Sequence, residues 1–110
     1  MRDANILIVG AGGIGSWLCY FLYDLQNKDQ FGRNNIVNIT IADPDTVEDK
    51  NLSYQNFDLE DITDNKAKVM EAKYGFLGKD TMITRSEQLS SYDLIISCVD
   101  NTSFRRLMFL

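Results

Sequence analysis

Histidine is absent from this sequence of 110 residues, and proline and cysteine are scarce, with one and two residues respectively. The missing imidazole excludes nucleophilic catalysis of the Ser-His-Asp and Cys-His types. A structural zinc site needs about four ligands, and Cys19 and Cys98 lie far apart without a CxxC spacing. We therefore expect two buried, reduced thiols. Any chemistry must use carboxylates, lysines, arginines, backbone amides or a bound metal.

Clusters of basic residues and long apolar runs are also missing. The net charge is -5, and because nucleic-acid binding starts from a basic face, no nucleic-acid partner is expected. No stretch approaches the roughly 20 apolar residues of a membrane helix, and the first apolar segment lacks the features of a signal peptide. We expect a cytoplasmic protein without membrane contact. The length suits one domain, residues 1–110.

Strand-like and helix-like patterns alternate along the chain. Short strands are expected over residues 4–9, 36–43, 78–85 and 92–100. Helices are expected over 14–28, from near Thr63 to Ala72, and over 101–110. The aromatic residues of 17–23 have helical spacing, and we expect them in the core. This order predicts an α/β fold, a Rossmann-like, doubly wound and mainly parallel sheet with flanking helices.

A glycine-rich turn joins the first strand to the first helix in the stretch ILIVGAGGIGS, residues 6–16. Glycines at Gly10, Gly12, Gly13 and Gly15 permit a tight turn, close packing of helix on strand, and approach of backbone amides to an anion. The N-terminus of the following helix favours a phosphate. The pattern predicts a nucleotide site, and a purely structural turn is the alternative.

Polar residues follow the other predicted strands. Asp43 has the position of an acid that accepts hydrogen bonds from a ribose, although it follows Gly15 by more than the about 20 residues typical of dinucleotide folds. The polar loop between them can absorb the excess, so NAD stays open. Further residues suit Mg-ATP better than hydride transfer, namely Asp45, Asn51, Gln55, Lys66 and Asp100.

Four motifs, in this order, resemble the ThiF family, the adenylating domains of MoeB-like, ThiF-like and ubiquitin-activating enzymes. They are GAGGIGS (10–16), ADPDTVEDKNLSYQ (42–55), the lysine of DITDNKAK (61–68) and DLIISCVDNTSFR (93–105). The resemblance implies that the C-terminal carboxylate of a ubiquitin-like or sulfur-carrier protein attacks the α-phosphate of ATP. An acyl-adenylate and pyrophosphate would result.

The resemblance also implies roles for individual residues. Gly13 would lie against the nucleotide, Lys66 would contact the phosphates with Lys68 as a less favoured substitute, and Asp100 would hold Mg2+. Lys66 and Asp100 are therefore the expected catalytic residues, and ordinary structural roles are the alternative. The expected cofactor-binding set is Gly10, Gly12, Gly13, Gly15, Asp43, Asp45, Lys50, Asn51, Leu52, Gln55, Lys66, Asn101 and Arg105.

Two features depart from the family pattern. The family motif N-L-x-R-Q has an arginine that reaches the ATP phosphates, whereas Tyr54 stands here and offers no planar cation. Family domains also continue beyond this length, so we expect this chain to be a portion of a family domain that is incomplete at its C-terminal end. We also expect it to form a homodimer or to contact the missing C-terminal part. The alternatives are a non-catalytic nucleotide-binding or scaffold subunit and an NAD-dependent oxidoreductase domain.

Overall fold

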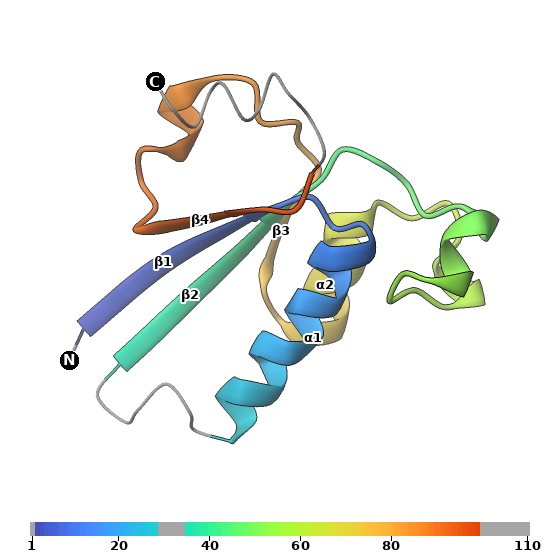
Figure 1. Ribbon diagram of the computed structural model, residues 1–110, viewed down its shortest axis with the longest axis horizontal. Helices are drawn as coiled ribbons and strands as arrows, with labels where there is room; N and C mark the ends of the chain where they lie inside the picture. Colours follow the sequence, from blue (N-terminus) through green and yellow to red (C-terminus); the bar gives the residue numbers. More distant parts are fainter. Residues whose placement is uncertain (1, 29–34, 100–110) are drawn as a thin grey trace.

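A parallel sheet forms the centre of the structure, a computed structural model that describes residues 2–28 and 35–99 (Figure 1). Its strands lie in the order β3-β2-β1-β4, and each neighbouring pair is parallel. The strands are β1 (Arg2–Val9), β2 (Asn35–Ala42), β3 (Leu77–Lys79) and β4 (Leu94–Ser97). The helices are α1 (Gly13–Asn27) and α2 (Lys66–Tyr74), with short 3-10 helices η1 (Asp49–Ser53), η2 (Leu59–Asp61) and η3 (Ser86–Leu89). The predicted α/β class is confirmed.

Both faces of β1 are covered, which explains its uninterrupted apolar run. Ile6 and Ile8 belong to the core cluster that includes residues of α1 and α2, whereas Leu7 and Val9 pack with Leu89 of η3. In Figure 1 the two α-helices lie on one side of the sheet and the segment with η3 on the other. Because successive strand residues point to opposite faces, a strand between two layers needs apolar residues at every position.

Two strands are shorter than the sequence predicts. β3 does not reach residue 85 but ends at Lys79, opposite Ala42, the last residue of its neighbour β2. β4 ends at Ser97, opposite Val9, the last residue of β1. A strand edge needs a partner for its backbone groups, so the length of the neighbouring strand limits each of them.

Helix α2 begins later than the expected start near Thr63. Asn65 caps it, because its side-chain oxygen accepts the amide of Lys68 at 3.0 Å. Thr63 has a φ of 79°, which lies outside the α-helical region. The helix expected over 101–110 lies outside the described residues.

The aromatic residues of α1 are not in the core, so that expectation is wrong. Trp17, Tyr20 and Phe21 are 42%, 42% and 57% exposed, whereas Ser16 and Cys19 are fully buried. When a helix has apolar residues on several sides, only one side can pack against the sheet. The spacing of the apolar residues does not reveal which side that is. Despite this apolar sequence, no helix within residues 2–28 and 35–99 is long and apolar enough to cross a membrane.

Candidate functional site

The carboxyl ends of β1, β2 and β4 meet at one edge of the sheet. Val9 lies opposite Ala42 on one side and Ser97 on the other. The amide of Gly10 donates to the Ala42 carbonyl at 2.9 Å, and the amide of Cys98 donates to the Val9 carbonyl at 2.8 Å. The glycine turn and the segments after β2 and β4 therefore come together, where open α/β sheets bind their ligands.

Two glycines of the turn are needed for packing. Gly10 has a φ of +100°, and a Cβ there would lie 2.5 Å from the Val99 side chain. A Cβ on Gly15 would overlap the carbonyl oxygen of Gly10. Glycine at these two positions lets the turn reverse and lets α1 begin directly against it.

At the other two glycines an added Cβ would meet side chains at ordinary distances. A Cβ on Gly12 would lie 3.7 Å from Nε2 of Gln55, and one on Gly13 would lie 3.5 Å from the Tyr54 ring. The first amides of an α-helix have no acceptor inside the helix, and Gly12, the N-cap of α1, provides no side-chain cap. These amides and the positive end of the helix dipole suit an anion.

Asp43 links the glycine turn to β2. Its two carboxylate oxygens accept the amides of Ala11 and Asp45, each at 2.7 Å, and the residue is 5% exposed. Burial raises the pKa of the Asp43 carboxyl above its ordinary value, against the lowering effect of these two hydrogen bonds. Each oxygen keeps a further lone pair, so Asp43 can hold the turn and still accept a hydroxyl hydrogen.

Gln55 holds a buried polar atom without a partner. The residue is 7% exposed, and its Oε1 has no hydrogen-bond partner within residues 2–28 and 35–99. Leaving such an acceptor unpaired costs about 1–3 kcal/mol. Since its Nε2 lies beside Gly12, this acceptor suits a hydrogen-bond donor of a ligand at the glycine turn. Asn51, by contrast, is engaged, because its Oδ1 accepts the Glu48 amide at 2.7 Å and shapes η1.

Lys66 is a buried cation near the same edge. It is the first residue of α2 and 8% exposed, and its charge lowers the pKa of the Asp43 carboxyl, so the ammonium group acts on this carboxylate. Its amide donates to the carbonyl of Asp45 at 2.9 Å. Lys50 is instead directed to solvent, where its ammonium group lies 3.4 Å from the Glu48 carboxylate.

An apolar cavity of about 150 Å³ lies beside Asp43. It includes Thr81, Met82 and Ile83, which follow β3 and which the sequence analysis assigned to a strand. Only their position after a strand could have indicated a role in a site. The remaining lining residues are Val9, Gly10, Ala42, Asp43, Pro44, Asp45 and Val99.

The structure thus brings together the glycine turn, Asp43, Gln55 and Lys66. Leu52 packs half-buried against the core cluster, and its role in the site stays a prediction. Asp100, Asn101 and Arg105 lie outside the described residues.

Neither a thiolate nor a metal cluster is found in the described part of the chain. Burial raises the pKa of Cys19 to about 12, and burial also raises the pKa of Cys98. The raised pKa values favour the protonated thiol at both residues, and both are free. Residues 2–28 and 35–99 contain no group of three Cys, Asp or Glu residues that could hold a metal ion.

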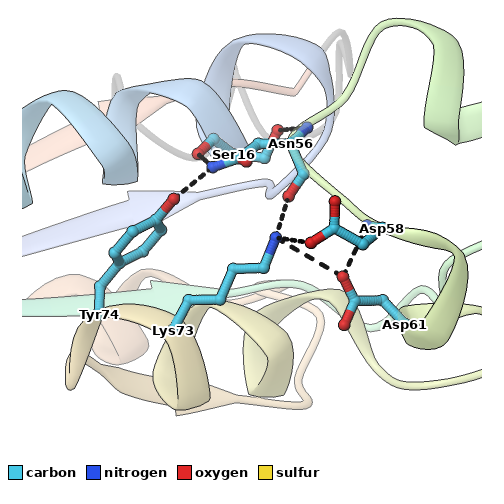
Figure 2. Close-up of polar contacts among 6 residues, drawn as sticks. All are labelled: Ser16, Asn56, Asp58, Asp61, Lys73 and Tyr74. Atoms are coloured by element: carbon cyan, nitrogen blue, oxygen red, sulfur yellow. Dashed lines mark hydrogen bonds and ion pairs between the residues drawn. The ribbon is translucent and has the colours of Figure 1, made fainter.

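A polar network beside the site was not foreseen from the sequence. Figure 2 shows Ser16 of α1 and Lys73 and Tyr74 of α2 directed toward Asn56, which follows Gln55. Ser16 belongs to the motif GAGGIGS, but no pattern marks the other three residues.

Over residues 1–109 the sequence matches the ThiF family. The chain belongs to the ThiF family. The adenylyltransferase and sulfurtransferase UBA4 of Yarrowia lipolytica is 31% identical over 121 residues, which cover 98% of this chain and 28% of that protein. SUMO-activating enzyme subunit 2 of Dictyostelium discoideum is 31% identical over 118 residues, which cover 96% of this chain and 16% of that protein. This ThiF chain therefore spans only a minor part of the length of these relatives.

Solved structures share the fold. The tRNA N6-threonylcarbamoyladenosine dehydratase TcdA of E. coli is 26% identical, with a TM-score of 0.73, and the match covers 89% of this chain and 42% of that chain. A structure of the same enzyme in complex with AMP is 27% identical, with the same TM-score. MccB of E. coli with ATP is 21% identical, with a TM-score of 0.54, and shares the fold. The resemblance and the Rossmann-like fold are confirmed.

Proposed function

We propose that this chain is the nucleotide-binding part of a longer ThiF protein and that it binds ATP with Mg2+. The whole protein would adenylate the C-terminal carboxylate of a ubiquitin-like or sulfur-carrier protein. The observation that carries the nucleotide site is the buried, unpartnered Oε1 of Gln55, whose side-chain Nε2 lies 3.7 Å from the position of a Cβ on Gly12. Hydroxyl and amino groups of a nucleotide are donors that can pair with it.

The residues at the strand ends suit the parts of ATP. The amides at the start of α1 and the ammonium of Lys66 suit the phosphates. Asp43 suits a ribose hydroxyl, because its carboxylate is buried and its oxygens keep free lone pairs. The cavity beside Asp43, with Met82 and Ile83 in its wall, suits an aromatic base.

The proposed reaction needs positioning and charge neutralisation more than acid-base chemistry. A carboxylate oxygen of the carrier forms a bond to the α-phosphorus, and the bond from that phosphorus to the bridging oxygen breaks. Pyrophosphate leaves with the electron pair. Because the carboxylate is already ionised at neutral pH, no histidine or other base is required. We assign charge neutralisation to Lys66 and to a magnesium ion that Asp100 would hold, and a role in nucleotide binding to Asn101 and Arg105.

The relatives support this proposal. One is an adenylyltransferase and sulfurtransferase, another is a subunit of a SUMO-activating enzyme, and TcdA has a complex with AMP. We further propose that the exposed aromatic residues of α1 contact a second copy or the rest of a longer chain, since exposed apolar patches mark interfaces. Two free thiols support a cytoplasmic location.

Calorimetric titration of the 110-residue chain tests the nucleotide site. ATP with Mg2+ should bind, and Gln55→Leu should weaken binding about tenfold or more, because the ligand donor would lose its acceptor. Gln26→Leu is the matched control, since Gln26 bonds the Val37 carbonyl at 3.3 Å and is not part of the glycine turn. Preference for NAD over ATP, or an equal loss in both variants, would contradict the proposal.

A non-catalytic nucleotide-binding or scaffold subunit is the second candidate, and Tyr54 favours it. The residue is 57% exposed, and its ring lies beside Gly13, where the family arginine would reach phosphates. If the missing cation limits phosphate binding, Tyr54→Arg should tighten ATP and leave adenosine unchanged. An unchanged affinity for ATP would argue that another cation already serves the phosphates.

A further inference from the structure

The segment 54–57, which contains Gln55, is hydrogen-bonded to both α1 and α2. From α1, Trp17 Nε1 donates to the carbonyl of Tyr54 at 3.0 Å. Ser16 receives two hydrogen bonds from Asn56, one at Oγ from the backbone amide at 3.0 Å and one at its carbonyl from Nδ2 at 3.2 Å. These contacts fix the segment on either side of Gln55 to the start of the helix that follows the glycine turn.

Helix α2 holds the same segment from the other side (Figure 2). Lys73 Nζ donates to the Asn56 carbonyl at 3.0 Å, and Asn56 Nδ2 donates to the Tyr74 hydroxyl at 2.6 Å. Asn56 thereby uses its amide, its carbonyl and both hydrogens of its side-chain amide. A residue with every donor engaged has little freedom to rotate, and Gln55 precedes it directly.

Lys73 also anchors the residues that follow. Its ammonium lies 3.5 Å from the Asp58 carboxylate and 3.6 Å from that of Asp61, and 5.9 Å from the centre of the Phe57 ring. The Lys73 and Asp61 side chains are 23% and 13% exposed, so solvent screens this pair less than a surface pair, whereas the Asp58 side chain is 67% exposed. One cation thus gathers a carbonyl, two carboxylates and a ring from a single loop.

Gln55 itself contributes nothing to this anchoring through Oε1, which has no partner in the described part of the chain. Its Nε2 lies 3.7 Å from the position of a Cβ on Gly12, and the backbone on either side of Gln55 holds the side chain there. We propose that Lys73 and Tyr74 are positioning residues of the nucleotide site, which act through Asn56 to hold Gln55 for a donor group of the ligand. This inference rests on the proposed nucleotide function.

A double-mutant cycle on the 110-residue chain tests it, with ATP and Mg2+ as the ligand. Lys73→Met should weaken binding about tenfold, equivalent to ~1.4 kcal/mol, and Lys73→Arg should restore most of it. In a Gln55→Leu background the same Lys73→Met change should have little effect, because it acts through Gln55. A role in stability alone would lower the melting temperature but leave the affinity of the folded protein unchanged. Lys28→Met is the charge-matched control, since Lys28 pairs with Asp24 at 3.0 Å at the far end of α1.

Tyr74→Phe keeps the proposal testable if Lys73→Met does not fold. It removes only the hydroxyl that accepts from Asn56 and should weaken ATP binding about two- to threefold, with coupling to Gln55→Leu. Equal binding by the wild type and both variants, or additive losses in the cycle, would overturn the positioning role while the nucleotide site stands. Failure of the wild type to bind ATP would overturn both.

Discussion

Thr63 adopts a backbone conformation that its side chain disfavours. Its φ is 79°, and within the described residues it shares the positive region only with Gly10 and Gly75. A β-branched residue at such a φ carries strain of about 1–3 kcal/mol. Backbone hydrogen bonds hold Thr63 in this conformation, because the Thr63 amide donates to the Val47 carbonyl at 2.9 Å and the Val47 amide donates to the Asp64 carbonyl at 2.8 Å.

Thr63→Gly should therefore stabilise the chain. Relief of the strain exceeds the added chain entropy of glycine in the unfolded state, which leaves a net gain of about 1 kcal/mol in the free energy of unfolding. Urea denaturation measures it. Gly75→Ala is the opposite control: Gly75 has a φ of 75° with no atom within 4 Å of an added Cβ, so only backbone strain acts, and about 1 kcal/mol should be lost. A Thr63→Gly chain of unchanged or lower stability would contradict this account.

The glycine turn is the element in which packing and ligand binding can be separated. Gly15→Ala should prevent correct folding, because its Cβ would overlap the Gly10 carbonyl oxygen. Gly12→Ala should fold, because its Cβ would meet Gln55 Nε2 at 3.7 Å, but the methyl group would occupy the approach to the helix amides and reduce ATP affinity. Circular dichroism and calorimetry distinguish the two. A folded Gly15→Ala chain, or a Gly12→Ala chain with full affinity, would show that the division is wrong.

The elements predicted from the sequence are those whose limits are set locally. The strand before the glycine turn, α1 and β2 were placed within about two residues of their observed bounds, because each is an apolar run that a segment with a glycine or a proline follows. β3 and β4 were predicted too long because their ends depend on neighbouring strands. The exposed side of α1 was misjudged because apolar spacing does not reveal which side meets the sheet.

The candidate site could be predicted from the sequence to the extent that the carboxyl ends of parallel strands bring their following residues together. Asp43 and the glycine turn follow two strands, and the fold brings them together. The hydrogen bond from the Ala11 amide to Asp43 was not predictable, nor was the network around Asn56, because the atoms involved come from segments far apart in sequence. The ligand-binding roles of all these residues stay predictions, and Asp100, Asn101 and Arg105 also lie outside the described part.

The charge of the whole molecule affects the binding of ATP. The chain carries a net charge of -5. Segment 43–64, which borders the proposed site, contains one basic residue, Lys50, and the acids Asp43, Asp45, Glu48, Asp49, Asp58, Glu60, Asp61 and Asp64. A highly charged anion approaching this end meets repulsion that the buried Lys66 and the start of α1 offset only nearby.

Removal of Mg2+ should therefore weaken ATP binding about tenfold or more, because the metal ion neutralises part of the phosphate charge before the nucleotide approaches the acidic segment 43–64. Adenosine carries no phosphate, so its affinity should not respond to Mg2+, and it serves as the control in the same calorimetric series. Neutralising Asp24, which lies in the last turn of α1 and pairs with Lys28 at 3.0 Å, should change ATP affinity little, because the length of the helix separates it from the glycine turn and ions screen charges beyond about 10 Å. Equal affinity for ATP with and without Mg2+ would mean that the protein's own cations neutralise enough of the phosphate charge. It would also mean that the acidic segment 43–64 does not limit ATP binding.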